Sequence, residues 1–87
     1  MAATVRIKRF VWTEHAEMRL RQRWLDGADV EDAIRDGHAG RSVNDGRADW
    51  LVSGETIDGT AFEAIYDHPH HGDIAAVRIV SVWRLDS

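Results

Sequence analysis

Residues 74–85 read Ile-Ala-Ala-Val-Arg-Ile-Val-Ser-Val-Trp-Arg-Leu and form the longest strand that the sequence predicts. Valine, isoleucine and tryptophan favour strands, and neither Gly nor Pro interrupts the segment. Side chains alternate between the two faces of a strand. One predicted face of this segment carries Val77, Ile79, Ser81 and Trp83, and the other carries Arg78, Val80, Val82 and Arg84.

Three segments before residue 74 continue this two-residue period. Residues 61–67 and 48–56 are predicted strands, and Asp58-Gly59 between them is typical of a hairpin turn. Residues 41–43 predict a further short strand. The sequence His-Pro-His-His-Gly-Asp at 68–73 indicates the turn that leads into the last strand.

The N-terminal part predicts one strand and a first helix. Residues 5–12 are rich in β-branched and aromatic side chains, as a strand requires. Thr13 is a suitable N-cap for a helix over residues 14–25, because its hydroxyl can accept from a free backbone N–H. At helical spacing, this segment forms an apolar stripe of Ala16, Leu20 and Trp24.

A second helix is predicted over residues 29–36. Asp26 or Asp29 can cap it, and Gly37 is a suitable residue for its end. The resulting order, β-α-α-β-β-β, predicts an α+β fold in which two helices pack on one face of an antiparallel sheet.

Composition limits the classes of protein that this chain can represent. With 87 residues, we expect one domain over residues 1–87. There is no cysteine, which excludes disulfides and thiolate sites, and no apolar stretch reaches the ~20 residues that span a bilayer. The N-terminus lacks the apolar segment of a signal peptide, so we expect a cytoplasmic protein.

The formal charge is −4, but the basic residues are concentrated near the N-terminus. Residues 1–23 hold six basic and two acidic side chains, whereas the rest holds five basic and thirteen acidic ones. This asymmetry permits a local basic patch on an acidic body.

The first candidate site is a helical stripe of His15, Arg19 and Arg23, spaced four residues apart. A metal-independent ribonuclease needs proton transfer near neutral pH, which His supplies, and cations for phosphate, which Arg supplies. The alternative is a solvated basic face that pairs with Glu14 and Glu17.

Arg78 and Arg84 of the last strand form the second candidate site. If helices cover the centre of the strand, the two Arg side chains lie at its ends, and Arg78 can bind phosphate in a cleft beside the first helix. Equally, Arg78 can pair with an acidic residue such as Asp67 on the neighbouring strand.

Two further groups are interpreted as structural. His68, His70 and His71 with Asp67 and Asp73 could ligate zinc or nickel, but they lie in a tight turn without a distant partner, so no metal is expected. Aromatic side chains could stack on bases, yet in a chain this short we expect them in the core; these are Trp50, Tyr66 and Trp83.

The N-terminal half resembles an uncharacterised bacterial family that has a domain-of-unknown-function label and a His-Ala-x-x-Arg-x-x-x-Arg signature. The residues that carry this resemblance are 12–23, then Val30-Glu-Asp-Ala-Ile, and Gly37. The C-terminal half is similar to the BrnT toxins, through Arg47, Leu51, Gly54, Gly59, Tyr66-Asp67 and residues 77–84. The resemblance implies that both groups share the fold of RelE-like ribonucleases, with helices first and an antiparallel sheet after.

The resemblance implies a toxin that cleaves RNA and is neutralised by a cognate antitoxin, without a cofactor. His15, Arg19 and Arg23 match the helix signature, and the last strand matches through Arg78, Ser81 and Arg84. In this hypothesis the chain is a metal-independent endoribonuclease with His15 as general base or acid and the Arg side chains on phosphate.

The alternative hypothesis is a non-catalytic module that binds a protein or nucleic acid on the same sheet. The acidic balance supports it, and so does the absence of the Lys-His-Gly element of the BrnT toxins.

Overall fold

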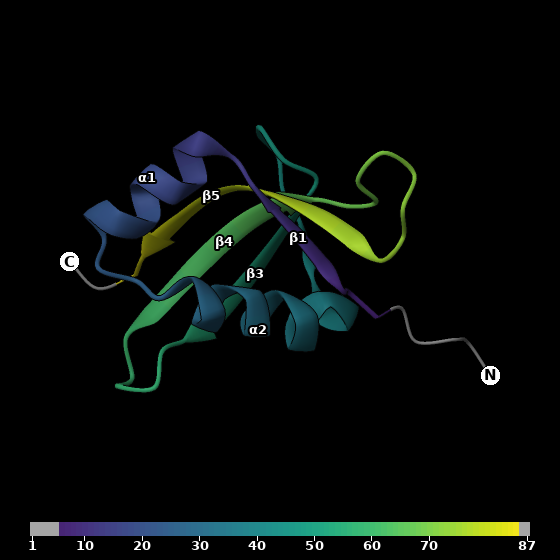
Figure 1. Ribbon diagram of the computed structural model, residues 1–87. Helices are drawn as coiled ribbons and strands as arrows, with labels where there is room; N and C mark the ends of the chain where they lie inside the picture. Colours follow the sequence, from purple (N-terminus) through teal and green to yellow (C-terminus); the bar gives the residue numbers. More distant parts are fainter. Residues whose placement is uncertain (1–5, 86–87) are drawn as a thin grey trace.

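The computed structural model describes residues 6–85 as two helices with a five-stranded sheet, an α+β fold (Figure 1). In chain order its elements are β1 (Arg9–Trp12), α1 (Glu14–Gln22), α2 (Gly27–Gly37), the 3₁₀ turn η1 (His38–Gly40), β2 (Ser42–Val43), β3 (Trp50–Glu55), β4 (Ala61–Asp67) and β5 (Ala76–Arg84). Within residues 6–85, neither helix has the length and apolar content needed to cross a bilayer.

The sheet is mixed and has the strand order β1-β5-β4-β3-β2. The pairs among β2, β3, β4 and β5 are antiparallel, as expected for strands joined by short turns. β1 instead pairs in parallel with β5, so the prediction of a wholly antiparallel sheet is wrong at this strand. The reason is the connection: α1 and α2 carry the chain from β1 to the far edge of the sheet, and three antiparallel steps from β2 then bring β5 beside β1 in the same direction.

Both helices bury side chains in one main core against the sheet. The core includes Ala16 of α1 and Val30 and Ile34 of α2, packed on fully buried strand residues such as Phe62, Tyr66, Val77, Ile79 and Val82. We call this side of the sheet the helix face. A smaller cluster of Ala48, Ile65 and Val80 lies on the opposite side, which we call the outer face.

A β-bulge in β5 changes which side chains share a face. Ile65 pairs with Ser81, but the next residue, Tyr66, pairs with Ile79, so Val80 is the extra residue. The bulge shifts the alternation, and Val82 joins Val77 and Ile79 in the main core. The prediction that Val80 and Val82 share one face is therefore wrong, and Arg78 and Arg84 lie on opposite faces.

The first helix is shorter than predicted, because α1 ends at Gln22 instead of residue 25. Leu25 N–H donates to the Leu20 carbonyl and Trp24 N–H to Arg21, the hydrogen bonds of a Schellman motif. Trp24 has a positive φ of 57° and its side chain is 88% exposed. The predicted apolar stripe thus holds for Ala16 and Leu20, which contact the main core, but is wrong for Trp24.

Other element boundaries differ from the predictions by a few residues. Of the predicted strand at 5–12, Val5 lies outside the described residues and β1 begins at Arg9. Thr13 caps α1 as predicted, and Asp26, one of the two proposed caps, accepts from Ala28 N–H at the start of α2.

Candidate functional site

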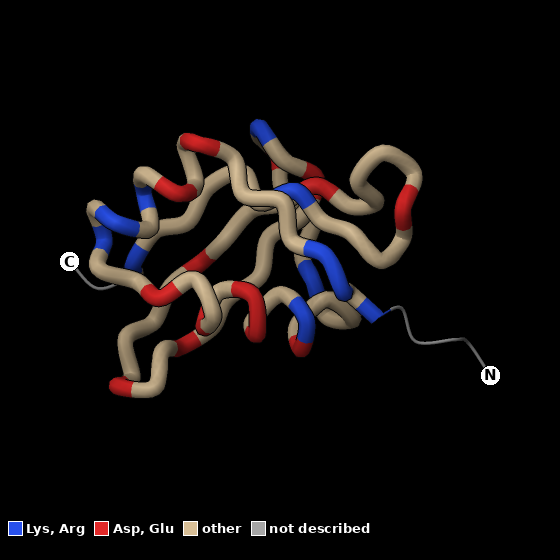
Figure 2. The backbone as a smooth tube through the Cα atoms, in the orientation of Figure 1, with Lys and Arg blue, Asp and Glu red and all other residues tan. Residues whose placement is uncertain are grey.

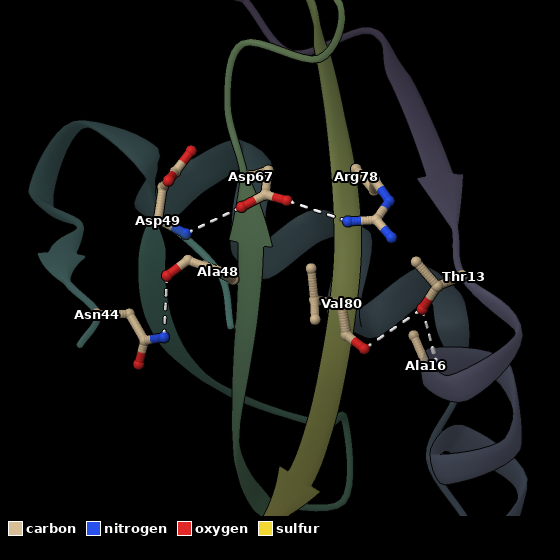
Figure 3. A network of polar contacts seen from close by, with 8 residues as sticks. All are labelled: Thr13, Ala16, Asn44, Ala48, Asp49, Asp67, Arg78 and Val80. Atoms are coloured by element: carbon tan, nitrogen blue, oxygen red, sulfur yellow. Dashed lines mark hydrogen bonds and ion pairs between the residues drawn. The ribbon is translucent and has the colours of Figure 1, made fainter. Parts of the chain in front are cut away.

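The candidate site lies on the outer face of the sheet, beside the start of α1. The loop over residues 44–49 folds onto this face, since Ala48 is buried against Ile65 and Val80. Asn44 Nδ2 donates to the Ala48 carbonyl at 3.0 Å and holds the loop in its turn (Figure 3). The loop between β2 and β3 therefore reaches the middle of the sheet, near β5.

Thr13 attaches α1 to the bulge of β5. Its hydroxyl accepts from Ala16 N–H at 3.0 Å and donates to the Val80 carbonyl at 3.3 Å (Figure 3). Thr13 N–H also donates to the Ile79 carbonyl at 3.2 Å. The first turn of α1, which carries His15, is thereby fixed relative to the strand that carries Arg78.

Arg78 lies on the outer face and is held by a carboxylate on the neighbouring strand. Its Nη1 donates to Asp67 Oδ2 at 3.2 Å, while Asp67 Oδ1 accepts from Asp49 N–H at 3.0 Å (Figure 3). This ion pair is the one expected in the alternative in which Arg78 pairs with Asp67 on the neighbouring strand. The Arg78 side chain remains 45% exposed beside this ion pair.

His15 contacts a cation that comes from the loop over the sheet. Arg47 Nη2 lies 3.4 Å from His15 Nε2. A guanidinium can only donate, so His15 Nε2 is the acceptor in this contact and has a lone pair on the exposed side of α1. The three segments that carry His15, Arg47 and Arg78 thus combine a potential base with two cations.

The other predicted site residues are distributed over the molecule. Arg19 follows His15 by one turn, is half-buried and donates to Gln22 Oε1 at 3.3 Å. Arg23 caps the C-terminus of α1 and is exposed. Arg84 lies on the helix face, pairs across the sheet with Phe62 and lines a hollow with Trp24, away from Arg78. Ser81 is buried.

The histidine turn is occupied by internal contacts. His68 Nε2 bonds the Ile74 carbonyl, and the His70 and His71 rings contact each other. Asp73 accepts hydrogen bonds from Ala75 N–H and from Arg9. Both lower the pKa of its carboxyl group, and the bond from Ala75 has the larger effect. Among residues 6–85, no group of three or more His, Asp or Glu side chains is arranged to hold a metal ion.

The aromatic side chains are mainly structural, as predicted. Tyr66 is completely buried, and Trp50 packs on the main core. Trp83 packs on the smaller cluster, where its Nε1 donates to Glu63 Oε1 at 3.1 Å.

Sequence reasoning missed a buried polar cluster around His38. His38 Nδ1 lies 2.7 Å from the Tyr66 hydroxyl, and the Arg41 guanidinium stacks on the Trp50 ring at 4.0 Å. Burial, with smaller contributions from Arg41 and His68, lowers the pKa of His38 to about 4. Burial also raises the pKa of Tyr66 to about 12. No periodicity relates these residues, so the sequence carries no local signal for the cluster.

Comparison with known proteins gives a match to a family profile. The chain fits the profile of the family described as "domain of unknown function (DUF4258)" over residues 12–84, which include both helices and four of the five strands. Searches of curated proteins and of solved structures gave no match. Because the profile covers more than half of the chain, this protein belongs to the DUF4258 family.

Proposed function

We propose that this chain is a metal-independent endoribonuclease and the toxin component of a toxin–antitoxin pair. The observation that supports the proposal best is the contact of His15 Nε2 with the Arg47 guanidinium beside the strand of Arg78. In this structure the lone pair of His15 Nε2 accepts from Arg47, and it becomes available when the Arg47 guanidinium turns to a phosphate. The site then combines a base with two cations, which suits RNA cleavage, in which a hydroxyl is deprotonated next to a phosphate.

The proposed reaction uses the ribose 2′-hydroxyl as nucleophile. When Arg47 binds the phosphate and releases His15 Nε2, this nitrogen takes the proton of the 2′-hydroxyl, the 2′-oxygen forms a bond to phosphorus, and the bond from phosphorus to the 5′-oxygen breaks. The leaving 5′-oxygen takes a proton from water, and the products carry a 2′,3′-cyclic phosphate and a 5′-hydroxyl. Arg47 and Arg78 stabilise the additional negative charge on the phosphate in the transition state.

The basic end of α1 extends this site along the RNA. Arg19, Arg21 and Arg23 take part in no ion pair within residues 6–85, and Figure 2 shows their segment as a blue group at one end of the molecule. These cations suit phosphates that flank the cleaved bond. Arg84 has no role in the proposed site because it lies on the helix face.

An antitoxin that inhibits this site would cover the outer face. Its surface is expected to carry carboxylates opposite Arg47 and Arg78, since an anionic partner competes directly with phosphate for both guanidiniums.

The test is expression of the wild-type chain and three variants in bacteria at matched soluble protein levels. Wild type is expected to arrest growth and fragment RNA, whereas His15→Ala and Arg78→Ala lose both effects. Removal of a general base typically costs about 10²–10⁴-fold in rate, so His15→Ala is expected to leave RNA intact. The control is Arg35→Ala, which removes an exposed Arg of α2 that pairs with Asp32.

Equal toxicity of His15→Ala and wild type would contradict the proposed role of this residue. Normal growth with intact RNA from soluble wild-type protein would contradict the ribonuclease proposal as a whole.

A non-catalytic binding module is the second candidate, favoured by one contact. Arg78, the cation in the middle of the outer face, is already paired with Asp67. Salt dependence separates the two kinds of partner, because nucleic-acid binding weakens steeply as salt rises and apolar protein binding does not.

A further inference from the structure

A groove runs along α2 on the side of the molecule that faces the hairpin between β3 and β4. It consists of two adjoining hollows of about 430 and about 420 Å³, which share Asp29, Thr56 and Ile57. We call it the acidic groove, because one basic side chain in its lining, Arg84, stands against six carboxylates, those of Asp26, Asp29, Asp32, Asp36, Glu55 and Asp58. Figure 2 shows red segments along α2 and on the hairpin at this side.

Two exposed apolar side chains line the acidic groove, Trp24 in the first hollow and Ile57 where the two hollows meet. Trp24, after α1, is 88% exposed, and Ile57, at the tip of the hairpin, is 97% exposed. They are the two most exposed large apolar side chains in residues 6–85. An apolar pair beside polar groups is typical of a surface that binds another molecule, because solvent exposure of both side chains is unfavourable in the free protein.

The backbone at Trp24 supports a role in binding. Its φ of 57° places it in the left-handed region, which is unfavourable for a residue with a Cβ and where Gly is usual after a helix. The exposed indole recovers little of this cost by burial. Trp at this position therefore adds little to the stability of the fold, and its indole is accessible to another molecule.

The charge of the groove determines which partner fits. Asp32 pairs with Arg35, Asp26 caps α2, and Asp58 accepts hydrogen bonds from Thr56 and Thr60. Asp29, Asp36 and Glu55 form no ion pair within residues 6–85. An anionic or nucleic-acid partner would be repelled by these carboxylates, whereas Lys and Arg side chains would compensate them.

We infer that the acidic groove docks a basic, amphipathic segment of a partner protein. Apolar side chains of this segment contact Trp24 and Ile57, and its cations lie over the carboxylates of α2 and Glu55. A second copy of this chain would have to present its basic helix α1 to the groove. It fits less well, because α1 also carries Glu14 and Glu17, which the carboxylates of the groove would repel. The groove belongs to the helix side of the sheet, so the inference does not rest on the proposed ribonuclease site.

The inference is tested by titrating the ¹⁵N-labelled full chain with two synthetic peptides. One carries Leu and Lys at helical spacing, and in the other Glu replaces every Lys. The Lys peptide is expected to shift the amide signals of α2 and residues 53–60 and to bind more weakly as salt rises. The Glu peptide is expected not to bind.

Two variants separate docking from folding. Trp24→Gly and Ile57→Ser are each expected to weaken binding of the Lys peptide at least about tenfold, as for central apolar anchors. The melting temperature of Trp24→Gly should be unchanged or higher, because Gly relieves the left-handed backbone. Val43→Ser, which alters a 73% exposed apolar side chain outside the groove, is the control and should leave binding unchanged.

Each alternative result would overturn the inference. The inference is wrong if the Lys peptide does not bind, or if the amide signals that it shifts lie outside the groove. It is also wrong if both peptides bind with equal affinity, or if Trp24→Gly and Ile57→Ser bind the Lys peptide as tightly as wild type does. Sedimentation of the free chain as a dimer that Ile57→Ser dissociates would assign the groove to a second copy instead.

Discussion

At the scale of single residues, the buried His38 makes stability depend on pH. Its pKa is lowered to about 4, whereas a histidine in the unfolded chain titrates near ~6.5. Between these values the unfolded chain binds the proton and the folded chain does not, so the free energy of unfolding falls as pH falls from about 6.5 to about 4. The expected loss is about 1–3 kcal/mol, measured by urea unfolding across this range.

Variants assign this pH dependence to His38. His38→Gln retains a polar side chain beside Tyr66 but does not titrate, so its stability should change much less over the same range. His71→Gln, at an exposed position of the histidine turn, is the control and should retain the full slope. An unchanged slope in His38→Gln would show that another group is responsible.

At the scale of elements, Thr13 determines where α1 begins and how it joins β5. Its hydroxyl satisfies the Ala16 N–H and donates to the Val80 carbonyl at the bulge. Thr13→Val keeps the shape but removes both hydrogen bonds, and we expect a loss of about 1–2 kcal/mol in the free energy of unfolding. Thermal or urea unfolding measures it, with Ser42→Ala, which removes a hydroxyl at an exposed position of β2, as the control that should leave stability nearly unchanged. A loss of under about 0.3 kcal/mol for Thr13→Val would contradict this role of the cap.

The contact between α2 and β3 requires a glycine. A Cβ at Gly54 would lie 2.7 Å from Ala33 Cβ and 2.8 Å from Phe62 Cζ, both closer than packed carbon atoms approach. Gly54→Ala is therefore expected to lower the free energy of unfolding by about 1–3 kcal/mol through overpacking. Gly40→Ala has no atom within 4 Å of the added Cβ and should leave stability nearly unchanged. If both variants were equally stable, this close approach would be wrong.

Local signals predicted the elements, and non-local contacts explain what they missed. Thr13 and the Asp58-Gly59 turn depend on neighbours in the chain, and both were recognisable. The parallel pairing of β1 with β5 joins residues that are more than sixty positions apart, and no periodicity encodes it. The bulge at Val80 moved Arg84 to the other face, because one extra residue inverts all later positions of a strand.

The candidate site was predictable only in part for the same reason. His15 and Arg78 were recognisable by residue type. The pair of Arg78 with Asp67 was also predictable, because these two residues lie on adjacent strands. Arg47 was recognised only within the family resemblance. Its contact with His15 arises because the loop over residues 44–49 folds across the sheet, a tertiary feature that composition cannot indicate.

At the scale of the whole molecule, charge is divided between two sides. The basic end of α1 and the outer-face cations suit phosphate, whereas the acidic groove along α2 repels it (Figure 2). Six carboxylates line the acidic groove, whereas Asp67 lies beside Arg78 on the outer face. The formal charge of −4 is thus distributed over both sides, and it does not by itself describe the candidate RNA surface. The two surfaces are expected to bind partners of opposite charge.

The most direct test of the ribonuclease proposal is incubation of the purified chain with RNA in the presence of EDTA, followed by analysis of the product ends. The proposal predicts cleavage without metal to 2′,3′-cyclic phosphate and 5′-hydroxyl ends, no cleavage at a 2′-deoxy position, and a rate about 10²–10⁴-fold lower in His15→Ala. Intact RNA after incubation with folded wild-type chain, or products with 5′-phosphate ends, would contradict it.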